Sequence, residues 1–474
     1  AIVCTHASNV TGDGNDIAQI GALCEKYNLY FILDASQTAG AAGIDMEQDH
    51  ISAICFTGHK GLFGPQGTGG IALADGVCVK PLLSGGSGVH SFERKHPMEL
   101  PVALEAGTLN GHGIAGLHAA LDWIKKTGIA AIHEKEMALA EQFQRGIETI
   151  PGIHLYGGEK RVAAIVSCNL ADLDSAYVSD CLAEDYGIAT RAGAHCAPLM
   201  HTHFGTEKQG MVRFSFSCFN TTEEVEKAVG AMRDIAAENR GKVTAYVGAG
   251  GKTSAIRKRA ETMRTEGKKV LILTTTKMMR PQEQEIFAAY EQTWQQRAIP
   301  DTASGWRECR TAEKKWKEQV QSVLDTYGCC VAGSLIPGTE KFGMLPEKLM
   351  EDLLYLADEI LIEADGSAHM PVKAPAEHEP VLFPYMDEVV IVMGAHAIGK
   401  PLMEVCHRVD YAKELLKCDA DKIVTAADIE TLAEQGYAIP IQKQFPWMKI
   451  SKVTGKDIKL CLTAEKKDKE RDKQ

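Results

Sequence analysis

The segment YFILDAS, residues 30–36, decides how the first half of this sequence folds. It is a short apolar run that ends in an aspartate, and AIVCTH (residues 1–6) and ISAICFTG (residues 51–58) have the same character. Between the first two runs, residues 15–27 carry apolar or aromatic side chains at helical spacing, namely Ile17, Ile20, Cys24 and Tyr27. Buried strands that alternate with helices predict an α/β sheet with crossover helices.

The composition limits the classes of function. A chain of 474 residues with 45% apolar and 24% charged residues is typical of a globular protein with two or three domains. The net charge of -12, without a long basic run, argues against a general nucleic-acid binder or a binder of anionic membranes. The 14 cysteines include no CxxC pair, which favours reduced thiols over a disulfide framework. We therefore expect a cytoplasmic protein from the reduced thiols and small-molecule ligands from the charge. No apolar run approaches the length of a membrane span.

The rest of the first half predicts a second, smaller αβ unit. A helical stretch near 113–148 precedes the strand AAIVSCNL, a helix over 175–186, the strand MVRFSFSCF and a helix over 222–239. The polar segment ENRGKV, residues 238–243, breaks that last helix, and a strand, a glycine turn and a helix follow it. We therefore expect a first domain over residues 1–240.

The second half shows four further apolar runs that are typical of buried parallel strands. They are KVLILTTT, CCVAGSL, DEILIEADGS and DEVVIVMG. We expect them to form a parallel α/β domain over residues 241–463, followed by a charged, disordered tail over residues 464–474.

A lysine and an aspartate lie at neighbouring strand ends of the first domain. Lys60 stands in the glycine-rich stretch FTGHKGLFGPQGTGG, and Asp34 ends the run YFILD, where open α/β sheets hold ligand groups. A lysine forms a Schiff base with pyridoxal phosphate where a carboxylate can hold the ring nitrogen and donors can hold the phosphate. The candidate donors are Gln37 and Asn9 for the ring oxygen and Thr57 and His59 for the phosphate. Taken singly, an aspartate at a strand end is more often only a helix cap, and a lysine in a glycine-rich loop is usually a solvated charge. The two motifs DxxQ and TGHK at adjacent strand ends nevertheless favour a cofactor site.

A second cluster, RAGAHCAPLMH at residues 191–201, places Cys196 in a polar loop. Neighbouring positive charge, including Arg191, would stabilise its thiolate as a nucleophile, whereas a buried cysteine would act only as a small hydrophobe. Arg213 lies inside the apolar strand MVRFSFS and needs an anionic partner, for which a substrate carboxylate is suited.

Six segments of the first half together resemble the class V aminotransferase group of pyridoxal phosphate enzymes, and in particular the cysteine desulfurases. They are SNVTG, ILDASQ, FTGHKGLFGPQGTGG, EAGTLN, RAGAHCAPLMH and VRFSFSCFNTTEEV, within residues 1 to about 235. The resemblance implies a partial fold-type I domain, made of a large-domain remnant and a small αβ lobe. It also implies pyridoxal 5'-phosphate as the cofactor and L-cysteine or L-selenocysteine as the substrate.

The resemblance further implies a role for each candidate residue. These are Lys60 as the Schiff-base lysine, Asp34 as the pyridinium partner, Gln37 and Asn9 as ring-oxygen contacts, Thr57 and His59 as phosphate contacts, Cys196 as the persulfide nucleophile, and Arg213 with Arg191 as ligands of the substrate carboxylate. Thr108, in GTLN, would reach the phosphate of the partner subunit in a homodimer. In this family a phosphate-binding loop and a ring that stacks on the cofactor lie upstream of the region where this chain begins. We expect the chain to be either a fragment of a longer one, which the absence of an initial Met favours, or a decayed domain.

The segment VTAYVGAGGKTS, residues 243–254, predicts a phosphate-binding loop in the second domain. Backbone amides at a helix start, together with a lysine and a hydroxyl, can hold nucleotide phosphates and magnesium. The spacing GxxGKT is tighter than the usual GxxxxGK[ST], and a glycine turn that merely caps a helix remains the alternative. The candidate nucleotide-binding residues, for ATP or GTP, are Gly248, Gly250, Gly251, Lys252, Thr253 and Ser254.

Acidic and hydroxyl groups follow two other strands of that domain. Glu363 and Asp365 end the run DEILIEADGS and, with Thr253, are candidate magnesium ligands, although Asp365 could simply cap the next turn. Residues 274–276 are three threonines at another strand end, followed by Lys277. We expect these groups to converge on one sheet edge.

The second half, from residue 243 to about 410, resembles the selenium-dependent hydroxylase accessory proteins of the YqeC type, a P-loop family. The segments are VGAGGKTS, LILTTTKM, LIEADGS, VKAPAEHEPV and VMGAHAIGKP. Carried over as site residues are Lys373, Glu377, His378 and Arg408, although His378 could equally belong to a capped surface turn.

The leading prediction is therefore a protein with two functions. A desulfurase-type module would mobilise sulfur or selenium on Cys196, and a nucleotide-binding factor would serve the maturation of a selenium-dependent molybdenum hydroxylase or another acceptor protein. The alternative is a nucleotide-dependent accessory factor whose first half is a non-catalytic dimerisation platform.

Overall fold

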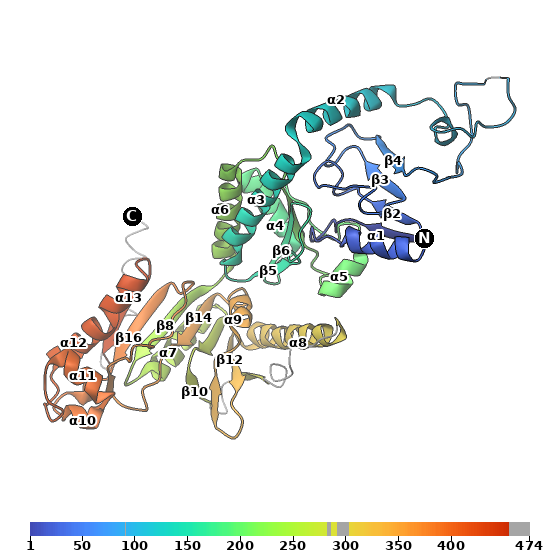
Figure 1. The fold of residues 1–474 in the computed structure, drawn as a ribbon. Coiled ribbons are helices and arrows are strands. Elements are labelled where there is room, and N and C mark those ends of the chain that lie inside the picture. Colours follow the sequence, from blue (N-terminus) through green and yellow to red (C-terminus); the bar gives the residue numbers. More distant parts are fainter. Residues whose placement is uncertain (91, 282–285, 292–302, 455–474) are drawn as a thin grey trace, which may run out of the picture. The chain divides into compact units, whose positions relative to one another are not determined.

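The chain folds into two compact units, Ala1–Ile235 and Ala236–Gln474 (Figure 1). The computed structural model describes residues 1–90, 92–281, 286–291 and 303–454, with side chains from residue 312 onwards in the helix that begins at Ala303. The division between the units falls within helix α6 (Thr222–Asn239), and the tail expected at 464–474 lies outside the described residues.

The first unit opens with the sheet that the sequence predicts. Its strands lie in the order β1-β2-β3-β4, with β1, β2 and β3 parallel and β4 antiparallel to β3. Their bounds are Ile2–Thr5, Phe31–Asp34, Ala53–Thr57 and Gly69–Leu73. Helix α1 (Ile17–Lys26) begins where the Asp16 side chain accepts a hydrogen bond from the Gln19 amide, and it buries Ile17 and Cys24. The parallel order brings the carboxyl ends of β2 and β3 to the same sheet edge.

A smaller antiparallel sheet completes the first unit, in the order β5-β6-β7 (Ile153–Tyr156, Ile165–Leu170 and Val212–Ser215). The accompanying helices are α2 (Gly111–Thr127), α3 (Ile129–Glu148), α4 (Ser175–Tyr186), α5 (Pro198–Phe204) and α6, with a 3-10 turn η1 at Val102–Leu104. The helical stretch expected near 113–148 is two helices, because Gly128 adopts a φ of 89° between them.

The second unit is built on one mostly parallel sheet. Its strand order is β10-β13-β12-β9-β14-β8-β16-β18, and β11 also pairs with β12. The bounds are β8 Lys242–Gly248, β9 Val270–Thr274, β10 Lys277–Met279, β11 Phe287–Tyr290, β12 Cys329–Leu335, β13 Lys341–Gly343, β14 Glu359–Glu363, β16 Glu388–Met393 and β18 Lys449–Thr454. The four apolar runs seen in the sequence are the strands β9, β12, β14 and β16, which confirms a parallel α/β architecture.

Helices and short elements cover this sheet. They are α7 (Lys252–Thr265), α8 (Ala303–Tyr327), α9 (Glu347–Leu353), η3 (Ala395–Ala397), α10 (Leu402–Val405), α11 (Val409–Leu416), α12 (Ala426–Ala433), a π-helical turn η4 (Glu434–Ala438), α13 (Ile439–Gln444), and the paired strands β15 (Val372–Lys373) and β17 (Cys406–His407). Helix α7 packs against β8, β9 and β14, and α8 packs against β11 and β12 (Figure 1).

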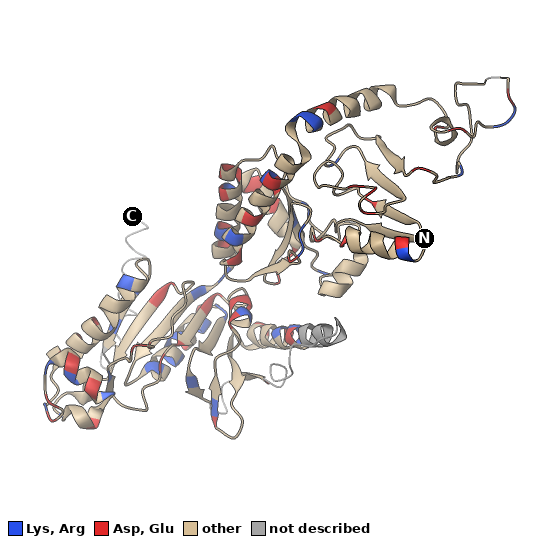
Figure 2. Ribbon diagram, in the orientation of Figure 1, with Lys and Arg blue, Asp and Glu red and all other residues tan. Residues whose placement is uncertain are grey.

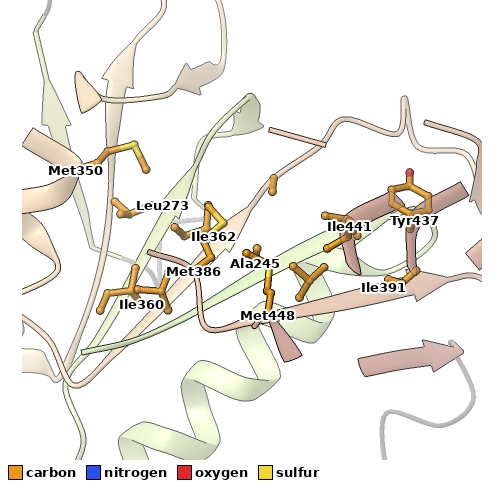
Figure 3. Packing of buried hydrophobic residues seen from close by; sticks show 14 of the residues in the cluster. Ala245, Leu273, Met350, Ile360, Ile362, Met386, Ile391, Tyr437, Ile441 and Met448 are labelled. Carbon is orange, nitrogen blue, oxygen red and sulfur yellow. The ribbon is translucent and has the colours of Figure 1, made fainter. Parts of the chain in front are cut away.

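Both faces of the central strands are buried, which explains why they read as continuous apolar runs. In β14, Ile360 and Ile362 belong to one hydrophobic cluster, whereas Leu361 belongs to the cluster beneath α7. Figure 3 shows part of the first cluster, in which Ile360 and Ile362 lie near Met386, and Tyr437 comes from the π-helical turn. This packing fixes the carboxyl ends of β8, β9 and β14 beside one another.

The surface carries mixed charge. Along α3 and α6, acidic and basic residues are interspersed (Figure 2). None of the helices in the described ranges has both the length and the apolar character that crossing a membrane requires.

Candidate functional sites

The first candidate site begins at the carboxyl end of β3. Thr57 is the last residue of that strand, and its hydroxyl lies 2.7 Å from Nδ1 of His59. A turn then presents Lys60, which is exposed. Partial burial lowers the pKa of the Lys60 amine, the Asp34 carboxylate opposes this effect, and the Arg213 and Arg191 guanidinium groups lower the pKa further. Lys60 therefore lies within the electrostatic reach of all three predicted partners, in a field that favours the neutral, nucleophilic amine.

Asp34 lies at the end of the adjacent strand, in register with Cys55 of β3. Its Oδ1 accepts hydrogen bonds from the Ser36 amide at 2.9 Å and the Ser36 hydroxyl at 2.6 Å. The residues after β2 form a turn and not a helix, so Asp34 is not the helix cap that the sequence left open, and its carboxylate is exposed at the sheet edge. Gln37 is half-buried in the turn that follows, and Thr108 is exposed in the loop that leads to α2.

Three hydrogen bonds fix the position of the loop that carries Cys196. His195 is buried, and its Nε2 lies 3.0 Å from the Arg191 carbonyl oxygen. Asn9 donates from Nδ2 to the His195 carbonyl oxygen at 2.6 Å, and Arg213 donates from Nη1 to the Asn9 carbonyl oxygen at 2.9 Å. His195 and Cys196 both have positive φ, 53° and 57°. Two successive non-glycine residues adopt a positive φ only where surrounding contacts impose that backbone conformation, and here the hydrogen bonds do so.

Cys196 itself is exposed, with Nη2 of Arg191 3.5 Å from its sulfur. Cys196 is therefore not a core residue, and its sulfur lies beside a cationic group. Arg191 and Arg213 also form a backbone bridge, with the amide of each donating to the carbonyl of the other at 3.2 Å and 2.9 Å. The two predicted substrate ligands are thereby placed side by side next to the sulfur.

Sequence reasoning assigned Asn9 to the cofactor ring and did not assign His195 a role. The structure shows both side chains fixing the cysteine loop, and the contact between Asn9 and His195 spans 186 residues, so local spacing gave no signal for it.

The second candidate site is the glycine turn between β8 and α7. Gly248, Gly250 and Gly251 have φ values of 92°, 79° and 138°, which other residues rarely adopt. A Cβ on Gly250 would lie 2.3 Å from the Pro371 carbonyl oxygen, and one on Gly248 would lie 2.2 Å from the Val392 carbonyl oxygen. Both positions therefore require glycine, for backbone conformation and for space.

Lys252 is the first residue of α7, and its side chain is only 3% exposed. Its Nζ lies 2.9 Å from Oδ1 of Asp365 and donates to the Gly248 carbonyl oxygen at 2.6 Å. Thr253 donates from its hydroxyl to Oε2 of Glu363 at 2.9 Å, and Ser254 is exposed in the same first turn. The six predicted nucleotide residues thus form one continuous turn at a helix N-terminus.

Asp365 lies at the centre of a buried network that the sequence did not predict. Its Oδ2 accepts from the Gly248 amide at 3.0 Å and from the Tyr437 hydroxyl at 2.9 Å, and it lies 3.4 Å from Nζ of Lys373. Lys373 also lies 2.8 Å from Oε2 of Glu379. Tyr437 is 72 residues from Asp365 along the chain, so sequence spacing could not reveal the contact.

The remaining predicted residues of this domain divide between that network and the surface. Arg408 joins the network through Nη2, 3.1 Å from Oε1 of Glu379, whereas Glu377 and His378 are exposed. The Thr274 hydroxyl donates to the Glu363 carbonyl oxygen at 2.9 Å, which places the ends of β9 and β14 in contact. Of the threonines at 274–276, Thr275 instead donates to the Val381 carbonyl oxygen, and Lys277 is exposed in β10.

The carboxylates proposed to bind magnesium differ in their surroundings. Burial raises the pKa of Glu363, the Lys252 ammonium and the Thr253 hydroxyl lower it, and Asp365 raises it. Across the described ranges, no group of three or more His, Cys, Asp or Glu side chains is placed to hold a metal ion.

Comparisons with known proteins match the two units to two families. Residues 1–228 match the family model for aminotransferase class-V, and residues 244–410 match that for YqeC protein. A probable cysteine desulfurase from Methanothermobacter thermautotrophicus is 33% identical over 240 residues, which are 50% of this chain and 60% of that protein. A cysteine desulfurase from Shigella flexneri is 31% identical over 236 residues, which are 49% of this chain and 57% of that protein. The chain thus spans about 60% of the length of such relatives.

A solved structure with similarity to this chain is an apo cysteine desulfurase from Thermococcus onnurineus. It is 30% identical to this chain and has a TM-score of 0.47. The matched region is 50% of this chain and 60% of that protein. Since both family models match and lie in separate compact units, this chain joins an aminotransferase class-V domain similar to cysteine desulfurases to a YqeC domain.

Proposed function

We propose that the first unit belongs to a pyridoxal phosphate enzyme that removes sulfur from L-cysteine, or selenium from L-selenocysteine. The observation that carries this proposal is that Asp34, Arg191 and Arg213 all lie within electrostatic range of Lys60, with Cys196 beside Arg191. These residues fit the cofactor, because the exposed Asp34 carboxylate lies near enough to act electrostatically on the Lys60 amine. When bound, the cofactor would supply an electron sink for the substrate carbons.

Each residue of the chain has a defined task in this proposal. The Lys60 amine would hold the cofactor covalently, and the Asp34 carboxylate would keep a proton on the ring nitrogen. Arg213 and Arg191 would bind the substrate carboxylate with paired hydrogen bonds. The Cys196 thiolate would form a bond to the substrate sulfur as the carbon–sulfur bond breaks. The bonding electrons stay with the substrate carbon, which takes up a proton and leaves as alanine, so no external oxidant is needed.

Two measurements on the purified chain supplemented with pyridoxal phosphate test this proposal. Lys60→Ala should abolish the visible absorbance band of the bound cofactor. Cys196→Ser should keep that band and lose alanine release from cysteine. Cys78→Ser is the matched control, since Cys78 is another exposed cysteine of the same unit and should leave both signals intact. A band that survives in Lys60→Ala would refute the assignment of the lysine.

We further propose that the second unit binds ATP or GTP with magnesium. The observation that supports this is the glycine turn with Lys252 and Thr253 at the start of α7, next to Glu363. Thr253 and Glu363 would face the metal, and the loop amides would face the phosphates. Nucleotide should raise the melting temperature of this unit, Lys252→Ala should remove the effect, and Lys400→Ala, a change at an exposed residue of the same unit, should not.

A link between the two activities completes the proposal. A persulfide or perselenide on Cys196 is a transferable atom, and the YqeC family match suggests a selenium-dependent molybdenum hydroxylase as its acceptor. The active form would be a homodimer in which Thr108 reaches the partner subunit's cofactor phosphate. If the chain binds nucleotide but neither cofactor nor substrate, the accessory-factor alternative with a non-catalytic first unit is the better description.

A further inference from the structure

Asp365 is a fully buried carboxylate whose contacts come from four separate segments. It meets Lys252 at the start of α7, the Gly248 amide at the end of β8, Tyr437 in the π-helical turn and Lys373 in β15. Asp365, Lys373 and Tyr437 are all 0% exposed. One carboxylate therefore has two ammonium groups beside it, at 2.9 Å and 3.4 Å.

The nearer ammonium belongs to the residue that would contact phosphate. In this structure Lys252 turns back onto its own loop, where Nζ donates to the Gly248 carbonyl oxygen and pairs with Asp365. A lysine held in this way is not available to a ligand in the turn. Phosphate binding would require Nζ to leave at least part of this ion pair.

The second ammonium group, that of Lys373, would keep Asp365 paired with a cation if Lys252 moved away. A buried carboxylate that loses its only cation is strongly destabilised. Asp365 would keep Lys373, the Tyr437 hydroxyl and the Gly248 amide after Lys252 moved. Lys373 is itself anchored by Glu379 at 2.8 Å and by the Gly366 carbonyl oxygen at 2.5 Å, so it stays in place.

We propose that Asp365 is a positioning residue that holds Lys252 inside the loop, and that Lys373 becomes its counter-ion when a phosphate draws Lys252 away. This inference rests on the proposed nucleotide binding and specifies how the site admits a phosphate-bearing ligand. It assigns Asp365 to the lysine and leaves Glu363, with Thr253, as the carboxylate for magnesium. The contacts favour this division, because both Asp365 oxygens face amide, hydroxyl or ammonium groups.

The ion pair can be tested without any nucleotide. The rate at which acetic anhydride acetylates Lys252 is measured by peptide mass spectrometry on the full chain. Asp365→Asn keeps the size of the side chain but removes its charge, so Lys252 should be acetylated several-fold faster than in the unaltered protein. Tyr437→Phe removes another contact of the same carboxylate and retains its charge, so it should not accelerate the reaction. Equal rates in Asp365→Asn and the unaltered protein would overturn the proposal.

Calorimetric titration with ATP, with and without magnesium, tests the second step. Releasing Lys252 raises the fraction of the competent loop, so Asp365→Asn should bind magnesium-free ATP about tenfold more tightly. Lys373→Met should weaken binding, because the departing lysine then leaves Asp365 uncompensated. Loss of magnesium-dependent binding in Asp365→Asn, with no gain without magnesium, would instead make Asp365 a metal ligand and refute the inference. If neither the unaltered protein nor any variant binds ATP, the nucleotide proposal fails. The acetylation rates still test the ion pair between Lys252 and Asp365.

Discussion

Replacing Gly250 by alanine should destabilise the second unit through two separable effects. Gly250 has a φ of 79°, and a left-handed backbone costs a residue with a Cβ about 1–2 kcal/mol. The new Cβ would also lie 2.3 Å from the Pro371 carbonyl oxygen and 2.7 Å from Gly394 Cα, both backbone atoms that cannot rotate away. Overpacking of this kind typically costs a further ~1–3 kcal/mol. The total expected loss is therefore about 2–5 kcal/mol, by adding these two ranges.

The chain offers a matched control for the first effect. Gly267 has a φ of 81°, but nothing lies within 4 Å of a Cβ placed there. Gly267→Ala should therefore cost only the backbone part, about 1–2 kcal/mol. Proteolysis of the full chain in increasing urea, read from peptides of residues 236–454, reports the stability of this unit in each variant. If the two variants lose the same stability, close packing around Gly250 is not what requires glycine there.

Three other predictions concern the core and the cysteine loop. The Ile360 side chain is 0% exposed in the centre of the sheet. Ile360→Ala should therefore lower the free energy of unfolding by about 2–5 kcal/mol in the same urea assay. A loss under about 1 kcal/mol would contradict the packing shown in Figure 3. Burial lowers the pKa of His195 from 6.5 to about 4, so the folded unit is most stable above pH 6.5 with respect to this group and loses stability as the pH falls towards 4. Melting curves of His195→Gln should therefore depend less on pH across this window. An unchanged pH dependence would refute the assignment. Arg191→Gln removes the guanidinium group 3.5 Å from the Cys196 sulfur, so it should slow the alkylation of Cys196 by iodoacetamide a few-fold near neutral pH, while Cys78 in the same sample keeps its rate. Equal slowing at both cysteines would point to a general change in the unit.

The sequence predicted the architecture well where burial controls it. Strands such as β2 and β14 are buried on one or both faces by helices, so the apolar runs marked them directly. The glycine turn before Lys252 was equally visible, because its positive backbone φ values favour glycine, although the close approach of Pro371 and Val392 was not visible. Gly128, which splits the predicted helix at 113–148, could have been recognised by the same reasoning.

The sequence predicted the members of the candidate sites better than their partners. Lys60 and Asp34 follow neighbouring strands, so the sheet topology alone brings them together. The partners of Asp365 come instead from β15 and the π-helical turn, whose positions depend on how the second unit closes on itself. Asn9 illustrates the same limit, since its hydrogen bond to the cysteine loop reaches across most of the first unit's sequence.

The last strand of the second unit has a practical consequence for anyone who expresses this protein. The YqeC family match ends at residue 410, whereas β18 continues the sheet beside β16 through Thr454 and Tyr437 fills part of its interior. A polypeptide trimmed to the matched range would expose one edge of β16 to other molecules. It would also leave a cavity in place of the Tyr437 side chain. Such a product should aggregate, and expression boundaries are better taken from the strand order than from the match.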